Sequence, residues 1–175
     1  MKQGAVYNTS YIFDRTGACV AEYDKIHGFS PAGEQRYFKG GDKTVQFVLD
    51  GVRCSVIICY DVRFLELVRT IALQGTELLF VPAQWPLARK LHWEILNKAR
   101  AIENQFYVCA VNGCGYAGET KFGGHSLLVS PLGDELVHMG EAEAIAVGTA
   151  DFSIIQTIRE TINVFRDRRP ETYQL

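Results

Sequence analysis

The stretch that decides the fold is Ser55-Val56-Ile57-Ile58-Cys59-Tyr60-Asp61-Val62-Arg63-Phe64. Its apolar, β-branched first half predicts a buried strand, and a helix-like pattern begins just after Cys59. A strand that stops at a nucleophile and turns sharply into a helix presents that side chain beside free backbone N–H groups. The positive end of the helix is also expected to favour the thiolate. The alternative, commoner for a lone cysteine, is a buried structural thiol.

The segments around Cys59 alternate between strand and helix patterns. We expect strands at 52–58, 77–81 and 106–112, and helices at 63–74 and 89–104, the first of which ends at Gly75. This order predicts parallel neighbouring strands with right-handed crossovers. A further strand at 45–49 should pair with 52–58 across Asp50-Gly51, a strong two-residue turn signal.

The flanking segments add antiparallel elements to this core. We expect hairpins from strands 5–13 with 18–23 and 124–129 with 135–138, a last strand at 144–151, and a short helix at 153–162. Between residues 24 and 44 lies a long polar loop, and a loop of that length in a compact domain is usually functional. The whole predicts an α/β fold, and a layered sandwich fits it better than an open Rossmann sheet.

Length and charge exclude several classes of protein. The 175 residues predict a single domain, 1–175, and the net charge of −2 gives no sign of a nucleic-acid or membrane-surface partner. No apolar run is long enough to span a bilayer, and no signal peptide is apparent. The five cysteines show neither zinc-site nor disulfide spacing, which predicts a reducing, cytoplasmic location.

A nucleophilic Cys59 needs a base or a positive neighbour. None of the four histidines stands out, and His125-Ser126 lacks a nucleophile elbow. Lys25, where a predicted strand runs into the long loop, and Glu34, nine residues later, are better candidates, although each alone is typical of an ordinary surface.

Three segments together carry a stronger signal, since their order and spacing resemble the carbon–nitrogen hydrolase family, the nitrilase superfamily. They are Tyr23-Asp24-Lys25-Ile26-His27, Gly33-Glu34 with Tyr37-Phe38, and Ile58-Cys59-Tyr60-Asp61. The likeness continues through 100–108, 124–131 and 163–173. Pro82-Ala83-Gln84-Trp85-Pro86 and the closing Val164-Phe165-Arg166 are most similar to the ω-amidase branch.

The resemblance implies an α-β-β-α sandwich that pairs as a homodimer or a higher homo-oligomer. It implies that Cys59 is the nucleophile, Lys25 the catalytic lysine and Glu34 a second glutamate that positions the lysine. The ammonium of Lys25 and the N–H of Tyr60 would then bind the oxyanion. Gln84 and Trp85 either line the acyl pocket or only pack. The resemblance implies no cofactor and no metal.

One departure from the family pattern matters. The family's first glutamate, its general base, lies well upstream of the lysine, and the residues before Lys25 offer no matching carboxylate. The opening strands and helices of the family are missing as well. We therefore expect a chain that corresponds to the C-terminal two-thirds of the family fold.

Two functions follow from these observations. The first is an amidase that releases ammonia from a small ω-amide through a cysteine thioester. The second is a catalytically impaired assembly module or fragment that lacks the first glutamate. A thiol redox protein is disfavoured, because no resolving cysteine suits Cys59.

Overall fold

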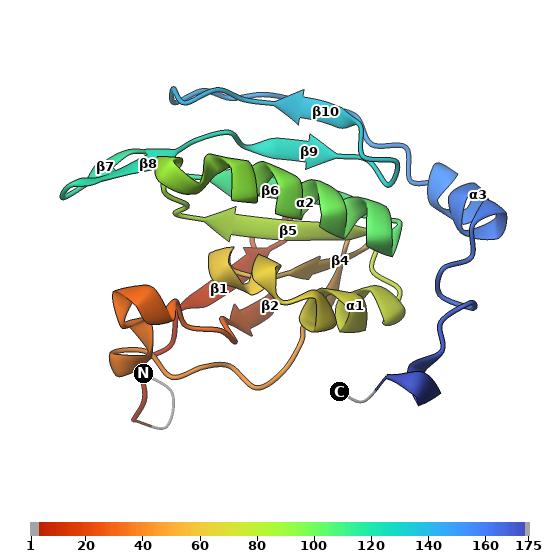
Figure 1. Ribbon diagram of the computed structural model, residues 1–175, viewed down its shortest axis with the longest axis horizontal. Helices are drawn as coiled ribbons and strands as arrows, with labels where there is room; N and C mark the ends of the chain where they lie inside the picture. Colours follow the sequence, from red (N-terminus) through yellow and green to blue (C-terminus); the bar gives the residue numbers. More distant parts are fainter. Residues whose placement is uncertain (1–3, 174–175) are drawn as a thin grey trace.

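A six-stranded mixed sheet forms the centre of the molecule (Figure 1). The computed structural model describes residues 4–173. The strands of the sheet lie in the order β10-β9-β6-β5-β4-β3. Their bounds are β3 Gln46–Leu49, β4 Val52–Val56, β5 Leu78–Ala83, β6 Tyr107–Asn112, β9 Leu127–Val129 and β10 Glu135–His138.

The parallel core of the sheet is the one that the alternation of strand and helix patterns predicted. β4, β5 and β6 are parallel neighbours, and the crossovers between them carry α1 (Leu65–Leu73) and α2 (Lys90–Asn104). The two helices contact each other and lie together over the sheet (Figure 1). Leu79 and Val81 of β5 are fully buried, whereas Leu78 and Phe80 on the opposite face are only half-buried.

The tight turn between β3 and β4 also matches its prediction. Asp50 and Gly51 both have positive φ, 50° and 86°, and the strands pair antiparallel from Leu49–Val52 outward. Two successive positive φ values suit the right-handed twist of a hairpin, and Asp-Gly tolerates them.

A separate two-stranded sheet carries the residues before the long loop. β1 (Thr9–Phe13) and β2 (Cys19–Asp24) pair antiparallel, and β2 contacts β3. Tyr23 is completely buried, and Ile12 and Ala21 pack against the core. The loop that follows contains two short 3-10 helices, Ser30–Ala32 and Glu34–Arg36. It returns to the hairpin through Gly41, whose N–H donates to the Lys25 carbonyl.

Three expectations need correction. The segment 144–151 is extended but pairs with no described strand, and its Ile145 is 96% exposed. A hairpin of β7 (Cys114–Ala117) and β8 (Thr120–Gly123) was missed, because its residues lack a strong alternating pattern. The loop expected from Pro82 starts later, because β5 continues to Ala83. The last pair of β5 with β4 is at Phe80, so the N–H that Pro82 lacks is not needed for a bond to β4.

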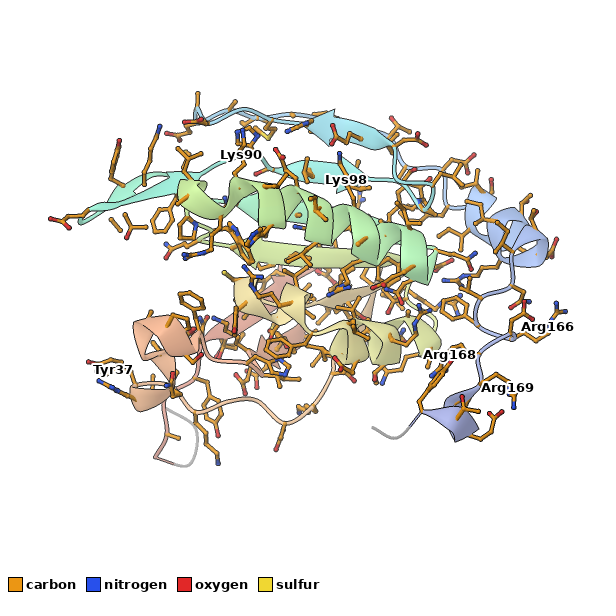
Figure 2. All side chains as sticks on the ribbon, in the orientation of Figure 1. Tyr37, Lys90, Lys98, Arg166, Arg168 and Arg169 are labelled. Carbon is orange, nitrogen blue, oxygen red and sulfur yellow. The ribbon has the colours of Figure 1, made fainter. Side chains whose placement is uncertain are left out.

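The C-terminal part runs along the end of the sheet. α3 (Ile154–Thr161) buries Ile155, and a last 3-10 turn spans Pro170–Thr172. Figure 2 shows Arg166, Arg168 and Arg169 around this last segment, away from the sheet. Within residues 4–173, no helix is both long and apolar enough to cross a bilayer.

Candidate active site

Cys59 lies at a sharp turn shortly after strand β4, which lies between β5 and the edge strand β3. The strand ends at Val56, the N–H of Ile57 donates to the Phe80 carbonyl of β5, and a 3-10 helix spans Cys59–Arg63. Cys59 itself has a φ of 50°, in the left-handed region that residues other than glycine rarely adopt. Such conformations persist where the surrounding structure over-determines them, and they cluster at functional sites.

A buried carboxylate, Asp61, holds this turn in place. Its Oδ2 accepts from the Tyr23 hydroxyl at 2.8 Å and from the Ile58 N–H at 3.0 Å. Its Oδ1 accepts from the His27 N–H at 2.9 Å, with His27 Nδ1 also at 2.9 Å. Burial, followed by the neighbouring carboxylate of Asp61, raises the pKa of Tyr23 above its ordinary value, so this hydroxyl stays a donor. Asp61 therefore ties β2 and the long loop to the Cys59 turn.

Lys25 and Glu34 form a buried ion pair beside Cys59. Lys25 Nζ donates to Glu34 Oε2 at 2.5 Å, and their side chains are only 5% and 14% exposed. Glu34 also accepts from the Phe29 N–H at 2.7 Å and from Asn8 Nδ2 at 3.0 Å. Burial raises the pKa of Glu34, but the bonds from Lys25, Asn8 and Phe29 outweigh it, so the net pKa lies below its ordinary value. The carboxylate is thus held ionised.

The thiol of Cys59 does not match the expectation that the following helix favours the thiolate. Burial raises its pKa above the ordinary value, although the N–H of Gln84, the charge of Lys25 and the N–H of Tyr60 each lower it. The helix that starts at Cys59 is a short 3-10 turn, whose end carries too few aligned dipoles to offset burial. As a nucleophile, Cys59 would therefore need a proton acceptor.

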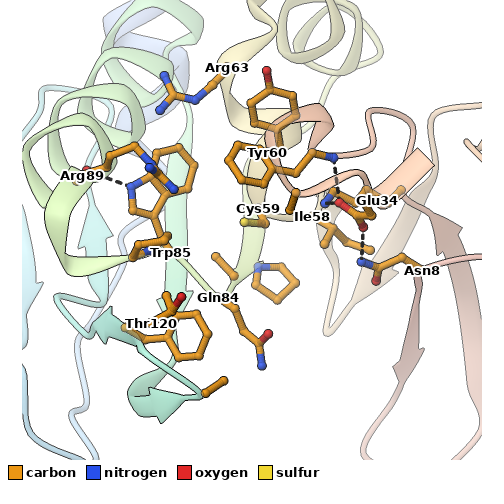
Figure 3. A pocket seen from close by; sticks show the side chains of 18 of the residues that line it. Asn8, Glu34, Ile58, Cys59, Tyr60, Arg63, Gln84, Trp85, Arg89 and Thr120 are labelled. Atoms are coloured by element: carbon orange, nitrogen blue, oxygen red, sulfur yellow. Dashed lines mark hydrogen bonds and ion pairs between the residues drawn. The ribbon is translucent and has the colours of Figure 1, made fainter. Parts of the chain in front are cut away.

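These residues line a cavity of about 820 Å³, a size that suits a small molecule. Lys25, Glu34 and Cys59 all border it, as do Gln84 and Trp85. In Figure 3, Cys59 and Tyr60 lie between Glu34 with Asn8 on one side and Trp85 with Arg89 on the other. We call Asn8, Lys25 and Glu34 the polar wall, and Arg63, Trp85 and Arg89 the arginine wall.

The arginine wall is built from guanidinium groups stacked on aromatic rings. Arg63 lies 4.8 Å from the Trp85 ring centre, and Arg89 lies 5.5 Å from that of Phe29. Trp85 is fixed by Asn112, whose side chain bonds both the N–H and the carbonyl of Trp85, at 2.6 and 3.2 Å. Among residues 4–173, no carboxylate forms an ion pair with Arg63 or Arg89.

The structure brings together the residues that the sequence analysis named, and it adds others. The structure brings Cys59, Lys25, Glu34, Tyr60, Gln84 and Trp85 to one cavity. It also adds residues that had no such prediction: Asn8, Arg63, Arg89, Thr120 and Phe122. Arg63 lies within the same motif as Cys59, so its position beside the Cys59 cavity could have been inferred from the sequence. Thr120 and Phe122 belong to the hairpin that the pattern did not reveal.

His125 and Ser126 do not line this cavity. The Ser126 hydroxyl accepts from the Asn112 N–H at 3.0 Å, and the His125 carbonyl accepts from Trp93 Nε1 at 2.8 Å. Both contacts are structural, in agreement with the lack of an elbow in the sequence.

Comparison with known proteins decides the family. The carbon–nitrogen hydrolase model matches residues 2–160. The chain belongs to the carbon–nitrogen hydrolase family. It is 42% identical to a 2-oxoglutaramate amidase of Bacillus subtilis over 172 residues, which cover 98% of this chain and 66% of the relative. The chain therefore spans about two thirds of that protein's length.

Solved structures confirm the α/β fold of the nitrilase type. A carbon–nitrogen hydrolase from Helicobacter pylori matches with a TM-score of 0.91 at 25% identity, over 95% of this chain and 64% of that one. A nitrilase-superfamily amidase from Nesterenkonia matches with a TM-score of 0.83 at 30% identity, over 93% and 59%. That structure is of a glutamate-to-glutamine mutant with a covalent adduct on the active-site cysteine.

Proposed function

We propose that Cys59 is the nucleophile of an amidase acting on small amides, with Lys25 and Tyr60 as oxyanion donors. The observation that carries this proposal is the placement of Cys59 at a strained turn that borders a cavity, with a buried Lys25–Glu34 pair beside it. A structural thiol needs neither a cavity of this size nor a buried lysine beside it.

The reaction follows from the groups around the sulfur. The Cys59 sulfur bonds to the amide carbonyl carbon, and the resulting oxyanion accepts from Lys25 Nζ and the Tyr60 N–H. The carbon–nitrogen bond then breaks, the nitrogen takes up the thiol proton, and ammonia leaves a thioester on Cys59. Water hydrolyses the thioester to the free acid and restores the thiol.

Proton transfer is the demanding part of this cycle in the chain described. Glu34 is the one carboxylate among residues 4–173 that lines the cavity, and its oxygens already accept from Lys25, Phe29 and Asn8. It is a positioning residue for Lys25 rather than a free base. We therefore expect acylation by a reactive substrate to outpace hydrolysis of the thioester, since the second step needs an activated water.

The substrate class follows from the arginine wall. Two guanidinium groups without an acidic partner suit a ligand that carries its own carboxylate, because bidentate pairing with arginine is strong and directional. An ω-amide of a small dicarboxylic acid has its amide and carboxylate at opposite ends. The 2-oxoglutaramate amidase of Bacillus subtilis bears the name of such a substrate.

The experiment is to incubate the 175-residue chain with a short series of ω-amides and to measure ammonia and intact mass. We expect a burst of about one equivalent of ammonia per Cys59, followed by slow turnover, together with a thioester mass that hydroxylamine removes. Cys59→Ala should show neither. Absence of both products with every amide and with an activated ester would overturn the proposal. Fast multiple turnover without an initial burst would instead show that Glu34 or Glu22 acts as the base.

Assembly and location belong to the same proposal. We expect a homodimer or a higher homo-oligomer in the cytoplasm, as the family resemblance implies. Sedimentation of the purified chain at two concentrations would test the assembly.

A further inference from the structure

A cluster of two histidines and one glutamate lies outside the candidate active site, on three different elements. Glu94 belongs to α2, His125 precedes β9, and His138 ends β10. The side chains of Glu94 and His125 are 18% and 14% exposed, and that of His138 is 36% exposed. No zinc-site spacing is visible in the sequence here, because the three residues come from separate segments that only the fold brings together.

The three polar atoms form a small triangle. His125 Nδ1 lies 3.0 Å from Glu94 Oε1, His138 Nε2 lies 3.3 Å from the same oxygen, and the two nitrogens are 3.2 Å apart. Four ligands at about 2.0–2.1 Å from a tetrahedral zinc ion are separated from one another by about 3.3 Å. The triangle therefore has the size of one face of such a site.

The other ring nitrogen of His138 is held as in known zinc sites. His138 Nδ1 lies 2.7 Å from Glu135 Oε2, and Glu135 forms an ion pair with Lys98 of α2. Figure 2 places Lys98 on the side of α2 that faces β9. A carboxylate that accepts from Nδ1–H leaves the lone pair of Nε2 directed at the triangle, and metal-bound histidines commonly have such a partner.

This arrangement lacks protons for a fully hydrogen-bonded cluster of neutral rings. With Nδ1–H of His138 directed at Glu135, only His125 Nδ1 can bring a proton into the triangle. His125 Nδ1–H can donate to Glu94 or to His138 but not fully to both. The acceptor that it does not reach then has no donor within the triangle. A cation in the centre would satisfy all three atoms together.

The backbone that carries the ligands is rigid. The His125 N–H donates to the Gly140 carbonyl at 3.0 Å, and the Met139 N–H donates to the Ser126 carbonyl at 2.9 Å. His125 has a φ of 51°, a conformation that a non-glycine residue adopts only where its surroundings impose it. The backbones at Gly124 and Gly140 also pack closely, since a Cβ added to Gly124 would lie 2.5 Å from the Gly140 oxygen.

We propose that Glu94, His125 and His138 bind one zinc ion, with water as the fourth ligand, and that the ion clamps the β9–β10 hairpin to α2. Two imidazoles and one carboxylate are a ligand set that suits zinc, whereas calcium and magnesium prefer oxygen ligands throughout. Trp93, next to Glu94, donates to the His125 carbonyl and packs against Trp85. A zinc ion at this site would therefore also help to hold Trp85 in the arginine wall. The proposal does not depend on the amidase activity.

The test is zinc binding by the untagged, chelator-treated chain, measured by calorimetry and by metal analysis after gel filtration. We expect one zinc per chain and a zinc-dependent rise in melting temperature. Cobalt(II) should give the intense visible absorption of a four-coordinate site. The same stoichiometry in Cys59→Ala would show that the catalytic thiol is not the ligand.

Substitutions locate the site. His138→Gln and Glu94→Gln should weaken zinc binding at least 100-fold, and Glu135→Gln, which removes only the carboxylate behind His138, by about tenfold. His92→Gln, which removes an exposed α2 histidine outside the cluster, should bind zinc like the unaltered chain. The proposal is overturned if the unaltered chain binds no zinc in the micromolar range, or if His138→Gln and Glu94→Gln both retain its affinity. Circular dichroism of each variant shows that a loss of binding is not a loss of fold.

Discussion

The polar wall and the arginine wall face the same cavity, yet their charges are handled in opposite ways. In the polar wall, Lys25 and Glu34 neutralise each other, and further hydrogen bonds complete the coordination of the carboxylate. In the arginine wall, two guanidinium groups rest on aromatic rings, and no described carboxylate pairs with them. The polar wall is thus complete without a ligand, whereas the carboxylate of the proposed substrate would complete the arginine wall.

We infer that chemistry and recognition are divided between the two walls. Groups that act on the reacting carbonyl must be fixed before the substrate arrives, because preorganised donors need no rearrangement during the reaction. Groups that recognise a distal carboxylate need free charge instead. The comparison predicts that changes in the polar wall lower kcat, whereas changes in the arginine wall raise KM.

The largest effect is expected for Cys59→Ala, which removes the proposed nucleophile between the two walls. Amidase activity should fall at least about 10⁴-fold, because no other described thiol borders the cavity. The measurement is ammonia release under saturating ω-amide. Cys19→Ala, which alters an exposed thiol on β2, serves as the matched control and should leave the rate unchanged. Equal loss in both variants would show that the effect is not specific to Cys59.

The next effect is expected for Glu34→Gln in the polar wall. The amide keeps the shape of the carboxylate but no longer balances the charge of Lys25, so kcat should fall by about 10²- to 10⁴-fold with little change in KM. Glu143→Gln, at an exposed position after β10 that does not line the cavity, is the control. A rise in KM with unchanged kcat would break the division between the two walls.

The same residue gives a dependence of stability on pH with a defined sign. The pKa of Glu34 in the folded protein lies below its ordinary value of 4.5. Its contribution to stability is therefore present above pH 4.5 and is lost as the pH falls through the lowered pKa. The difference in melting temperature between the unaltered chain and Glu34→Gln should shrink from neutral pH to about pH 3. A constant difference over this range would show that the carboxylate charge contributes nothing to stability.

A smaller effect is expected for Arg63→Met and Arg89→Met in the arginine wall. Each variant keeps an aliphatic side chain over the neighbouring ring but loses the charge, so KM for an ω-amide should rise about 10- to 100-fold at similar kcat. An amide of similar size without a carboxylate should be hydrolysed equally well by variant and parent. Lys90→Met, which alters a nearby α2 residue that does not line the cavity, is the matched control.

Much of this arrangement could be predicted from sequence, because it depends on local patterns. The apolar run that ends at Cys59 and the Asp50-Gly51 turn both specify their own geometry, and the structure has them where predicted. Lys25 and Glu34 were candidates because of their place at the long loop, and only the family resemblance assigned their roles. The structure places them at one cavity, and their roles stay predictions.

The remainder depends on contacts between distant segments. The 144–151 segment has a strand-like composition, but pairing rather than composition makes a strand, and no described partner is present. The Glu94, His125 and His138 cluster joins a helix to a hairpin, which no spacing rule reveals. Asp61 looked like part of a motif, and only the fold shows that it links β2, the long loop and the Cys59 turn.

The smallest effect on activity is expected for Tyr23→Phe, which tests how the polar wall is held rather than what it does. Tyr23 is buried on β2, two residues before Lys25, and donates to Asp61, so its hydroxyl joins the strand of the lysine to the turn of the cysteine. Its loss should lower the free energy of unfolding by about 1.5–3 kcal/mol, as is usual for a bond to a charged group. Urea unfolding measures this loss of stability, and Tyr11→Phe, at an exposed position of β1, is the control.

The kinetic outcome of the same variant then separates two views of the cavity. If the walls are independent, Tyr23→Phe should lower kcat less than Glu34→Gln does and leave KM for the ω-amide unchanged, because Asp61 keeps its bonds from His27 and Ile58. A rise in KM as large as that of Arg63→Met would mean that Asp61 transmits the change along its own 3-10 helix to Arg63. The polar and arginine walls would then be one unit, positioned by a single buried carboxylate.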